Sequence, residues 1–505
     1  MNANKKIAFN SLIIFIRLCI VSVISLVCSR IVLDALGASD YGLYNVVGGI
    51  VTLLNVVNSS MMSTTYRFIA FELGRKHERR LNRVFNNSFL IHAAFSFFIV
   101  LLGLTIGDWY IVHYLNVPSG KIDDALFVFH VSLATAAINT ILVPFQGTLV
   151  AYERFSAIAL IDIVTNILKI VAILLLIYHV GDRLRTYSII MFFSLLLNSG
   201  GYFAYCLKRY AAAVTPHFSF DKTIMKEMLG FAFWTLFGAC ANIGKVQGSA
   251  VIINYFFGTI VNSAFAIANQ VENFILMFAR TLNNAAIPQI TKSYGGGDQR
   301  RSIILTSYIS KYTYMLMCLV AFPTILEMDF LLGLWLKEVP AGTTVFCQLI
   351  ILGGLLDCLG AGIPALVNAT GTIRNYQVIL HTFTLTGLPI AFILYQLGFN
   401  QYTISVVYCV IIALCSLLRL ILLKTIYHLD ISIIIKISYI KIIYISAPLV
   451  FFYLLYNPVS RSVFGHVSGL LLSELFLLFV MAAFGMDNVE RGKVLGYIRN
   501  KMNKK

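Results

Sequence analysis

Fourteen apolar runs divide this 505-residue sequence, and each is about as long as a helix that crosses a lipid bilayer. At about 1.5 Å of rise per residue, a hydrocarbon core of about 30 Å needs about 20 residues in a helix. Helices of this length satisfy their own backbone hydrogen bonds inside lipid. The sequence therefore predicts an all-α polytopic membrane protein with about 14 transmembrane helices. The expected spans are residues 8–31, 43–70, 84–106, 125–149, 156–179, 186–206, 228–252, 260–287, 303–325, 345–369, 376–397, 403–423, 438–457 and 464–484.

The composition excludes a soluble globular protein. Hydrophobic residues make up 59% of the chain, and only 12% of its residues are charged, about half of the usual share. The net charge of +16 does not indicate nucleic-acid binding, because the basic residues gather in short loops between apolar runs. The nine cysteines show no CxxC spacing. We therefore expect neither a nucleic-acid partner nor a metal site nor a disulfide framework.

The loop charges predict an orientation. With both termini in the cytoplasm, 24 of the 38 Lys and Arg residues lie in cytoplasmic segments and 5 in outer loops, and the other 9 lie within spans. An excess of basic residues in inside loops is typical of membrane proteins. We expect a multi-pass protein of the cytoplasmic (inner) membrane with both termini cytoplasmic. The apolar run after Lys5 and Lys6 is longer than that of a signal peptide, which predicts an uncleaved first helix.

An internal repeat is visible in glycine, arginine and proline positions. Gly37 and Gly258 lie 221 residues apart, as do Gly74 and Gly295, whereas Pro144 and Pro364 lie 220 apart. Six expected spans separate the related positions, so spans 1–6 and 7–12 are expected to form parallel repeats. The predicted organisation is two six-helix lobes plus two C-terminal helices. The predicted domains are residues 1–212, 213–430 and 431–505, the last including a basic cytoplasmic tail.

Two of the expected spans carry a polar stripe that includes an arginine. One stripe is Asn45, Thr52, Asn55, Ser59, Ser63 and Arg67, and the other is Asn262, Asn269, Asn273, Arg280 and Asn284. Their spacing returns to one helix face. Polar residues in hydrocarbon face a bundle interior or a watery cavity, where they mark substrate paths. We therefore predict a transporter with a cationic cavity, in which Asn55, Asn269 and Asn273 line the substrate path.

Two segments resemble a known family of exporters. These are SRIVLDALGASDYGLYNVVGGIV (Ser29–Val51) and FGTIVNSAFAIANQVENFILMFARTLNNAAIPQITKSYGGGDQRR (Phe257–Arg301). Together with the 6+6+2 arrangement, they resemble the polysaccharide-exporter branch of the multidrug/oligosaccharidyl-lipid/polysaccharide exporter superfamily. The resemblance covers essentially the whole chain. It implies two six-helix lobes around a central cavity, alternating access, and export of a lipid-linked oligosaccharide or another amphipathic solute.

Five basic residues within the spans are candidates for binding substrate: Arg17, Arg67, Arg280, Lys169 and Lys245. Arginine offers a planar fork that binds phosphate oxygens, and in the resembled branch cavity cations are expected to hold a pyrophosphate. Alternatives remain for each residue. Arg17 is also suited to a structural ion pair, and Arg67 and Arg280 to contact with headgroups. For Arg30, Arg419 and Lys441, near helix ends or in peripheral helices, we expect the side chain to reach the membrane interface, and Lys311 is a candidate for the same role.

Two carboxylates are candidates for coupling transport to an ion. Glu272 and Asp357 both belong to the second repeat, and both are expected at mid-depth. Carboxylate and amide oxygens suit hard cations, so the pair predicts a Na⁺ or H⁺ site, and no other cofactor is expected. Glu272 is equally suited to neutralising Lys245. Asp162 lies seven residues before Lys169 on one helix face, where the two are expected to pair.

The sequence offers no support for an enzyme. Gly244 and Lys245 lack the upstream glycine and the following Ser or Thr of a phosphate-binding loop. No nucleophile–base pair stands out, and no sizeable loop exceeds about 30 residues, which is too short for a soluble catalytic domain. A membrane-embedded glycosyltransferase or ligase is the least favoured alternative.

The preferred hypothesis is therefore a flippase for an undecaprenyl-pyrophosphate type oligosaccharide in cell-surface polysaccharide (O-antigen type) synthesis. Its expected partners are the lipid-linked oligosaccharide, the bilayer, a polysaccharide polymerase and glycosyltransferases. The alternative is a cation-coupled multidrug or organic-solute antiporter of the same superfamily. The spans hold nine basic residues against four acidic ones. Because an anionic substrate requires cavity cations, this count favours the flippase.

Overall fold

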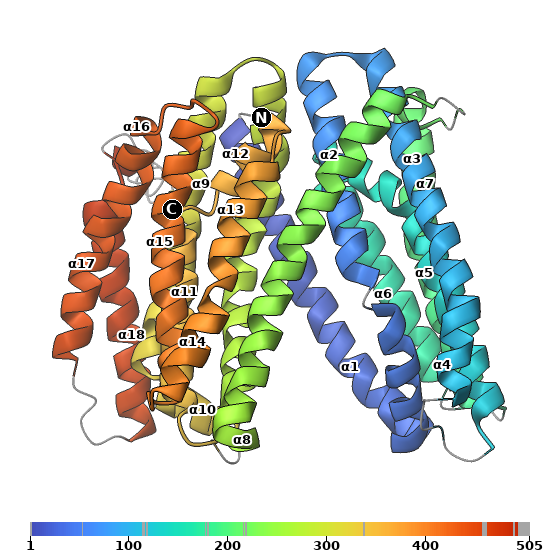
Figure 1. Ribbon diagram of the computed structural model, residues 1–505, viewed down its shortest axis with the longest axis horizontal. Helices are drawn as coiled ribbons and strands as arrows, with labels where there is room; N and C mark the ends of the chain where they lie inside the picture. The colour runs from blue at the N-terminus through green and yellow to red at the C-terminus, as the bar shows by residue number, and fades with distance from the viewer. Residues whose placement is uncertain are drawn as a thin grey trace, which may run out of the picture. The chain divides into compact units, whose positions relative to one another are not determined.

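The computed structural model is helical, and its described residues contain no β-strand (Figure 1). The structure describes residues 3–52, 54–113, 117, 120–176, 178, 181–215, 217, 220–336, 339–456, 462–487 and 490–492. Its contacts divide the chain into two compact units. Unit 1 comprises Met1–Ala239 and Thr291–Asp298, and unit 2 comprises Cys240–Ile290 and Gln299–Lys505. The three-domain division at residues 212 and 430 stays a prediction.

Unit 1 is built around a central helix, α5, which packs against α1, α2, α3 and α7. Small residues on α5, including Ala136, Ala137 and Gly147, are buried, and they let neighbouring helices approach closely. Helix α6 packs against α1 and α7. The elements of this unit are α1 (Ala3–Thr52), α2 (Leu54–Arg75), α3 (Glu78–Leu102), the π-helical turn η1 (Gly103–Gly107), α4 (Asp108–His113), α5 (Ile122–Ala151), α6 (Phe155–Leu176) and α7 (Arg183–Val214).

Two long helices are broken at glycines of the expected repeat. Helix α1 is interrupted at Gly37, and α8 (Lys222–Gly295), whose residues belong to both units, is interrupted at Gly258. Both glycines have φ of 77°, a left-handed conformation that side chains with a Cβ disfavour. The two positions, 221 residues apart, thus share one unusual backbone conformation.

Unit 2 is built around α9, the most buried of the long apolar helices, with 61% of its most apolar stretch inside the protein. Helix α9 packs against α11 and also against the C-terminal helix α18. The elements after α8 are α9 (Gln299–Leu326), α10 (Met328–Trp335), α11 (Thr343–Cys358), α12 (Ile363–Thr370), α13 (Arg374–Leu385), α14 (Gly387–Gln396), α15 (Thr403–Thr425), α16 (Ser432–Ile434), the π-helical turn η2 (Ile435–Tyr439), α17 (Ile440–Leu455), α18 (Val463–Val480) and the π-helical turn η3 (Met481–Gly485).

Ten helices among the described residues are long and apolar enough to cross a membrane, and the bent pair α11–α12 makes an eleventh. The two members of that pair differ in direction by 46°, so the expected span 345–369 is a broken helix. The expected spans 8–31, 43–70 and 260–287 are not among these helices, and the described apolar part of the first is the shorter segment Phe9–Val21. Two of these three carry the polar stripes, which lower their mean hydropathy. The predicted all-α class is confirmed.

Candidate functional site

A polar cavity of about 540 Å³ lies within unit 1. One face of α6 contributes Asp162, Thr165, Asn166 and Lys169, whose spacing of three and four residues places them side by side. Helices α1, α2, α5 and α7 supply the other walls. The remaining lining residues are Arg17, Tyr44, Asn58, Ser132, Thr135, Ala136, Asn139, Gln146, Ser188, Met191, Ser194, Leu195, Asn198 and Tyr202. Most of these side chains carry an amide or a hydroxyl group, so the cavity is suited to a polar solute.

Asp162 forms the centre of a hydrogen-bonded cluster in this cavity. Its Oδ2 lies 3.0 Å from Nη1 of Arg17. Its Oδ1 accepts a hydrogen bond from Nδ2 of Asn198 at 2.8 Å and another from the Tyr202 hydroxyl. The expected pairing of Asp162 with Lys169 is therefore wrong, because Arg17 reaches the carboxylate from α1. The structural ion pair that the sequence left open for Arg17 is the arrangement observed.

Lys169 lines the same cavity, and among the described residues its ammonium group has no ion pair or hydrogen bond. Among the described residues of the lining, the charged ones are Arg17, Lys169 and Asp162. Two cations and one carboxylate leave the cavity with a net charge of +1.

The other expected substrate-binding cations lie elsewhere. Arg67 is buried in unit 1, outside this cavity, with its guanidinium 4.4, 5.0 and 5.4 Å from the ring centres of Phe68, Phe71 and Phe231. Arg280 is an exposed residue of α8 in unit 2. A single cluster of all five cations is thus not described, and their binding role stays a prediction.

The expected polar path residues are only partly described. Asn55 lies in α2, but its side chain falls outside the described residues. Asn269 donates its side-chain NH₂ to the main-chain oxygen of Phe265 at 2.8 Å, and Asn273 donates to that of Asn269 at 2.9 Å. Both amides thus bind their own helix one turn back, which leaves their side-chain oxygens able to accept a further ligand.

Unit 2 contains a group of charged residues around Glu272. Its Oε1 lies close to Gly354, where an added Cβ would approach that oxygen to 3.1 Å. Glu272 interacts electrostatically with Lys245, Asp357 and Arg280. Among the described residues no hydrogen bond or ion pair holds its carboxylate. The ammonium of Lys245 lies 5.0 Å from the ring centre of Tyr408.

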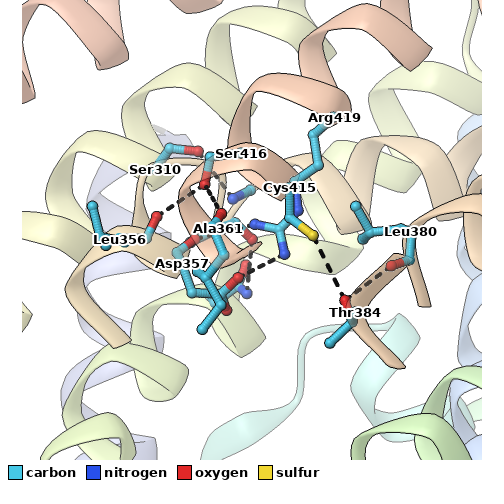
Figure 2. A network of polar contacts seen from close by, with 12 residues as sticks. Ser310, Leu356, Asp357, Ala361, Leu380, Thr384, Cys415, Ser416 and Arg419 are labelled. Carbon is cyan, nitrogen blue, oxygen red and sulfur yellow. Dashed lines mark hydrogen bonds and ion pairs between the residues drawn. The ribbon is translucent and has the colours of Figure 1, made fainter. Parts of the chain in front are cut away.

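Asp357 forms an ion pair with Arg419 of α15 (Figure 2). Nη2 of Arg419 donates to Oδ1 of Asp357 at 2.6 Å, and Nη1 donates to the main-chain oxygen of the same residue at 3.2 Å. Arg419 is only 8% exposed. The expectation that its side chain reaches the membrane interface is wrong, because the guanidinium is buried and pairs with the carboxylate of Asp357 on α11. Next to the pair, Ser416 donates to the main-chain oxygen of Leu356 at 3.0 Å.

Two further basic residues expected at the membrane interface are also paired. Lys311 is fully buried, and its Nζ lies 2.9 Å from both carboxylate oxygens of Glu490. Lys441 lies 3.2 Å from Asp487. Interface contact is therefore wrong for Lys311, and Lys441 has a carboxylate partner. Glu490 and Asp487 both follow the last expected span, so the count of acidic residues within the spans does not include them.

Sequence reasoning missed the α7 wall of the cavity. Asn198 and Tyr202 are four residues apart within an apolar helix, and polar residues at that spacing were the available signal. No group of three or more metal-binding side chains occurs in the part of the chain that the structure describes.

Comparisons with known proteins agree with this architecture. Residues 14–175 match the MatE family model. No curated protein matches the sequence. A crystal structure of MATE in the bent conformation is 15% identical with a TM-score of 0.72, and the alignment covers 83% of this chain and 94% of that chain. The MATE transporter ClbM in complex with Rb⁺ is 13% identical with a TM-score of 0.70, covering 82% and 93%. An outward-facing multidrug resistance MATE family transporter of the MOP superfamily is 14% identical with a TM-score of 0.67, covering 82% and 94%.

At these identities the likeness shows the fold, which is that of MATE transporters. The expected multi-pass membrane architecture is confirmed. The inner membrane and the cytoplasmic termini stay predictions.

The preferred function, a lipid-linked oligosaccharide flippase, is overturned. The matching family model and the similar structures are those of MATE transporters, one of them a multidrug resistance transporter. They favour the alternative, a cation-coupled solute antiporter. The count of nine bases against four acids misled because it treated every base as available to an anion. Arg17, Lys311, Arg419 and Lys441 are each paired with a carboxylate.

Proposed function

We propose that this chain is a membrane transporter that exchanges an organic solute for a cation by alternating access. The observation that carries the proposal is the polar cavity of unit 1, enclosed by helices of a MATE-like fold. Small-molecule sites commonly measure about 300–1,000 Å³, and the cavity of about 540 Å³ falls in that range. Polar and charged side chains in membrane helices are costly unless they face a cavity or each other.

Glu272 is the residue that we assign to cation coupling. A carboxylate that lacks a hydrogen bond inside the protein binds a proton or a hard cation more readily than one already held by an arginine. Asn269 and Asn273 lie three residues before and one residue after it, with side-chain oxygens left to accept a cation. Asp357 already pairs with Arg419, so in this proposal it acts as a charged neighbour of Glu272.

The test is gradient-driven transport by the purified full chain in proteoliposomes. A panel of anionic, cationic and uncharged fluorescent solutes is loaded, and a Na⁺ or proton gradient is imposed in either direction. The wild-type protein should move at least one solute at a rate that depends on the gradient.

Glu272→Gln should abolish that dependence, whereas Glu474→Gln, which removes a carboxylate from α18 outside the repeat, should keep it. Equal gradient dependence in Glu272→Gln would contradict the coupling assignment. Absence of gradient-driven movement of every solute by the wild-type protein would contradict the proposed function.

A further inference from the structure

One charged group that lines the cavity of unit 1, the ammonium of Lys169, has no ion-pair partner among the described residues. The carboxylate of Asp162 forms an ion pair with Arg17 through one oxygen and accepts hydrogen bonds from Asn198 and Tyr202 on the other. These contacts neutralise its charge and leave little capacity to bind an added cation. Arg17 is engaged by the same pair, which limits its capacity to bind an anion.

Lys169 is the remaining charge of the cavity. It lies seven residues after Asp162 on the cavity face of α6, and among the described residues no carboxylate pairs with it. A partly buried ammonium without a counter-charge attracts an anion more strongly than one in water, because the surrounding protein screens the charge less.

The rest of the lining favours a polar molecule. Asn139, Asn166 and Gln146 present amides, and Ser132 and Ser194 present hydroxyls. Such groups hydrogen-bond the oxygens and hydroxyls of a water-soluble solute, whereas an acyl chain would require an apolar wall.

We propose that the transported solute is a small water-soluble organic anion whose carboxylate or phosphate group is bound by Lys169 in the unit 1 cavity. The Arg17–Asp162 pair forms a neutral wall beside it, and Lys169 determines the sign of charge that the cavity accepts. This inference rests on the proposed transport function and names its substrate class.

The test compares two xanthene dyes of opposite charge, carboxyfluorescein and rhodamine 123, in proteoliposomes that contain the full chain. The wild-type protein should move carboxyfluorescein at least about tenfold faster than rhodamine 123, since about 1.4 kcal/mol of preference corresponds to a factor of ten. Lys169→Gln should lower carboxyfluorescein transport about tenfold, and Lys169→Arg should restore much of it. Lys169→Glu changes the net cavity charge from +1 to −1 and should reverse the preference.

Lys208→Gln is the matched control, because this exposed lysine of α7 lies outside the cavity lining. It should leave both rates unchanged. A fluorescently labelled phosphatidylglycerol in the same vesicles distinguishes a lipid headgroup from a free anion, and transport of the lipid in place of carboxyfluorescein would overturn the inference.

Faster wild-type transport of rhodamine 123, unaffected by Lys169→Gln, would overturn the anion inference and leave the transport proposal intact. If neither dye moves but another solute of the panel moves with the gradient, the anion inference alone is overturned. If no solute moves under any gradient, both proposals are overturned. The wild-type preference is measured without any variant, so the test does not depend on the folding of altered chains.

Discussion

Replacing Glu490 by alanine should leave a fully buried ammonium group without its carboxylate. Lys311 is 0% exposed, and both oxygens of Glu490 lie 2.9 Å from its Nζ. The Tyr312 hydroxyl donates to one of these oxygens, and the main-chain N–H of Asp487 donates to the other at 2.8 Å. The carboxylate thus ties the segment after the last helix to α9.

The expected loss follows from what remains when the acid is removed. Breaking a buried ion pair by deleting one partner costs about 3–5 kcal/mol, because the other charge stays buried and uncompensated. Glu490→Ala should therefore lower the free energy of unfolding by about that amount. The double variant Lys311→Met with Glu490→Ala should recover most of it, since no buried charge remains.

Unfolding of the purified protein in a denaturing-detergent titration measures this loss. Asp487→Asn is the control, because it breaks a partly exposed pair. The side chain of Lys441 is 26% exposed and that of Asp487 is 39% exposed. Partly exposed pairs contribute about 1 kcal/mol or less. Equal losses in Glu490→Ala and Asp487→Asn would refute the argument that burial makes the Lys311 pair strong.

Three further predictions use the same unfolding measurement. Asp357→Ala should lower the free energy of unfolding by about 3 kcal/mol or more, because it leaves the guanidinium of Arg419, which is only 8% exposed, without its carboxylate partner. A loss below about 1 kcal/mol would contradict the paired geometry. Gly258→Ala should lower the free energy of unfolding by about 1–2 kcal/mol, because φ at this position is 77°. Gly200→Ala, where the added Cβ would meet open space, should not lower it. Equal losses in the two variants would contradict the left-handed conformation of Gly258. The third prediction concerns pH. Burial raises the pKa of Glu490, but its hydrogen bonds outweigh burial and hold the pKa below the ordinary value of 4.5. The stability that the Glu490 carboxylate contributes should therefore be complete above pH 4.5 and be lost as the pH falls through its folded pKa. The difference in stability between wild type and Glu490→Ala should accordingly shrink in acid, and a difference that grows there would contradict the sign.

The helical membrane class could be predicted from the sequence because length and hydropathy suffice for it. The repeat could also be predicted, because the backbone at Gly37 and Gly258 adopts a positive φ that favours glycine. Glycine therefore occurs at both positions and marks the repeat in the sequence. The bend between α11 and α12 was less readable. Pro364 and the glycines at positions 353, 354, 360 and 362 indicate a kink in this span, but they do not determine the size of the bend, which is 46°.

The ion pairs of the site could not be predicted from spacing along one helix. Glu490 pairs with a lysine 179 residues earlier in the chain, and Asp162 is reached by Arg17 from another helix. Local periodicity carries no information about which helices pack together. For that reason the sequence left Lys169 undistinguished from the bases that are paired.

The most direct test of the account is the accessibility of the unit 1 cavity from each side of the membrane. Ser194 lines the cavity, and Ser194→Cys in a background free of other cysteines provides a probe for a membrane-impermeant thiol reagent. Alternating access predicts that the cysteine reacts from both sides, and that a Na⁺ or proton gradient shifts reactivity from one side to the other. Glu272→Gln should remove the shift. Reaction from one side only, at a rate that no gradient changes, would contradict a transporter that carries its solute through this cavity.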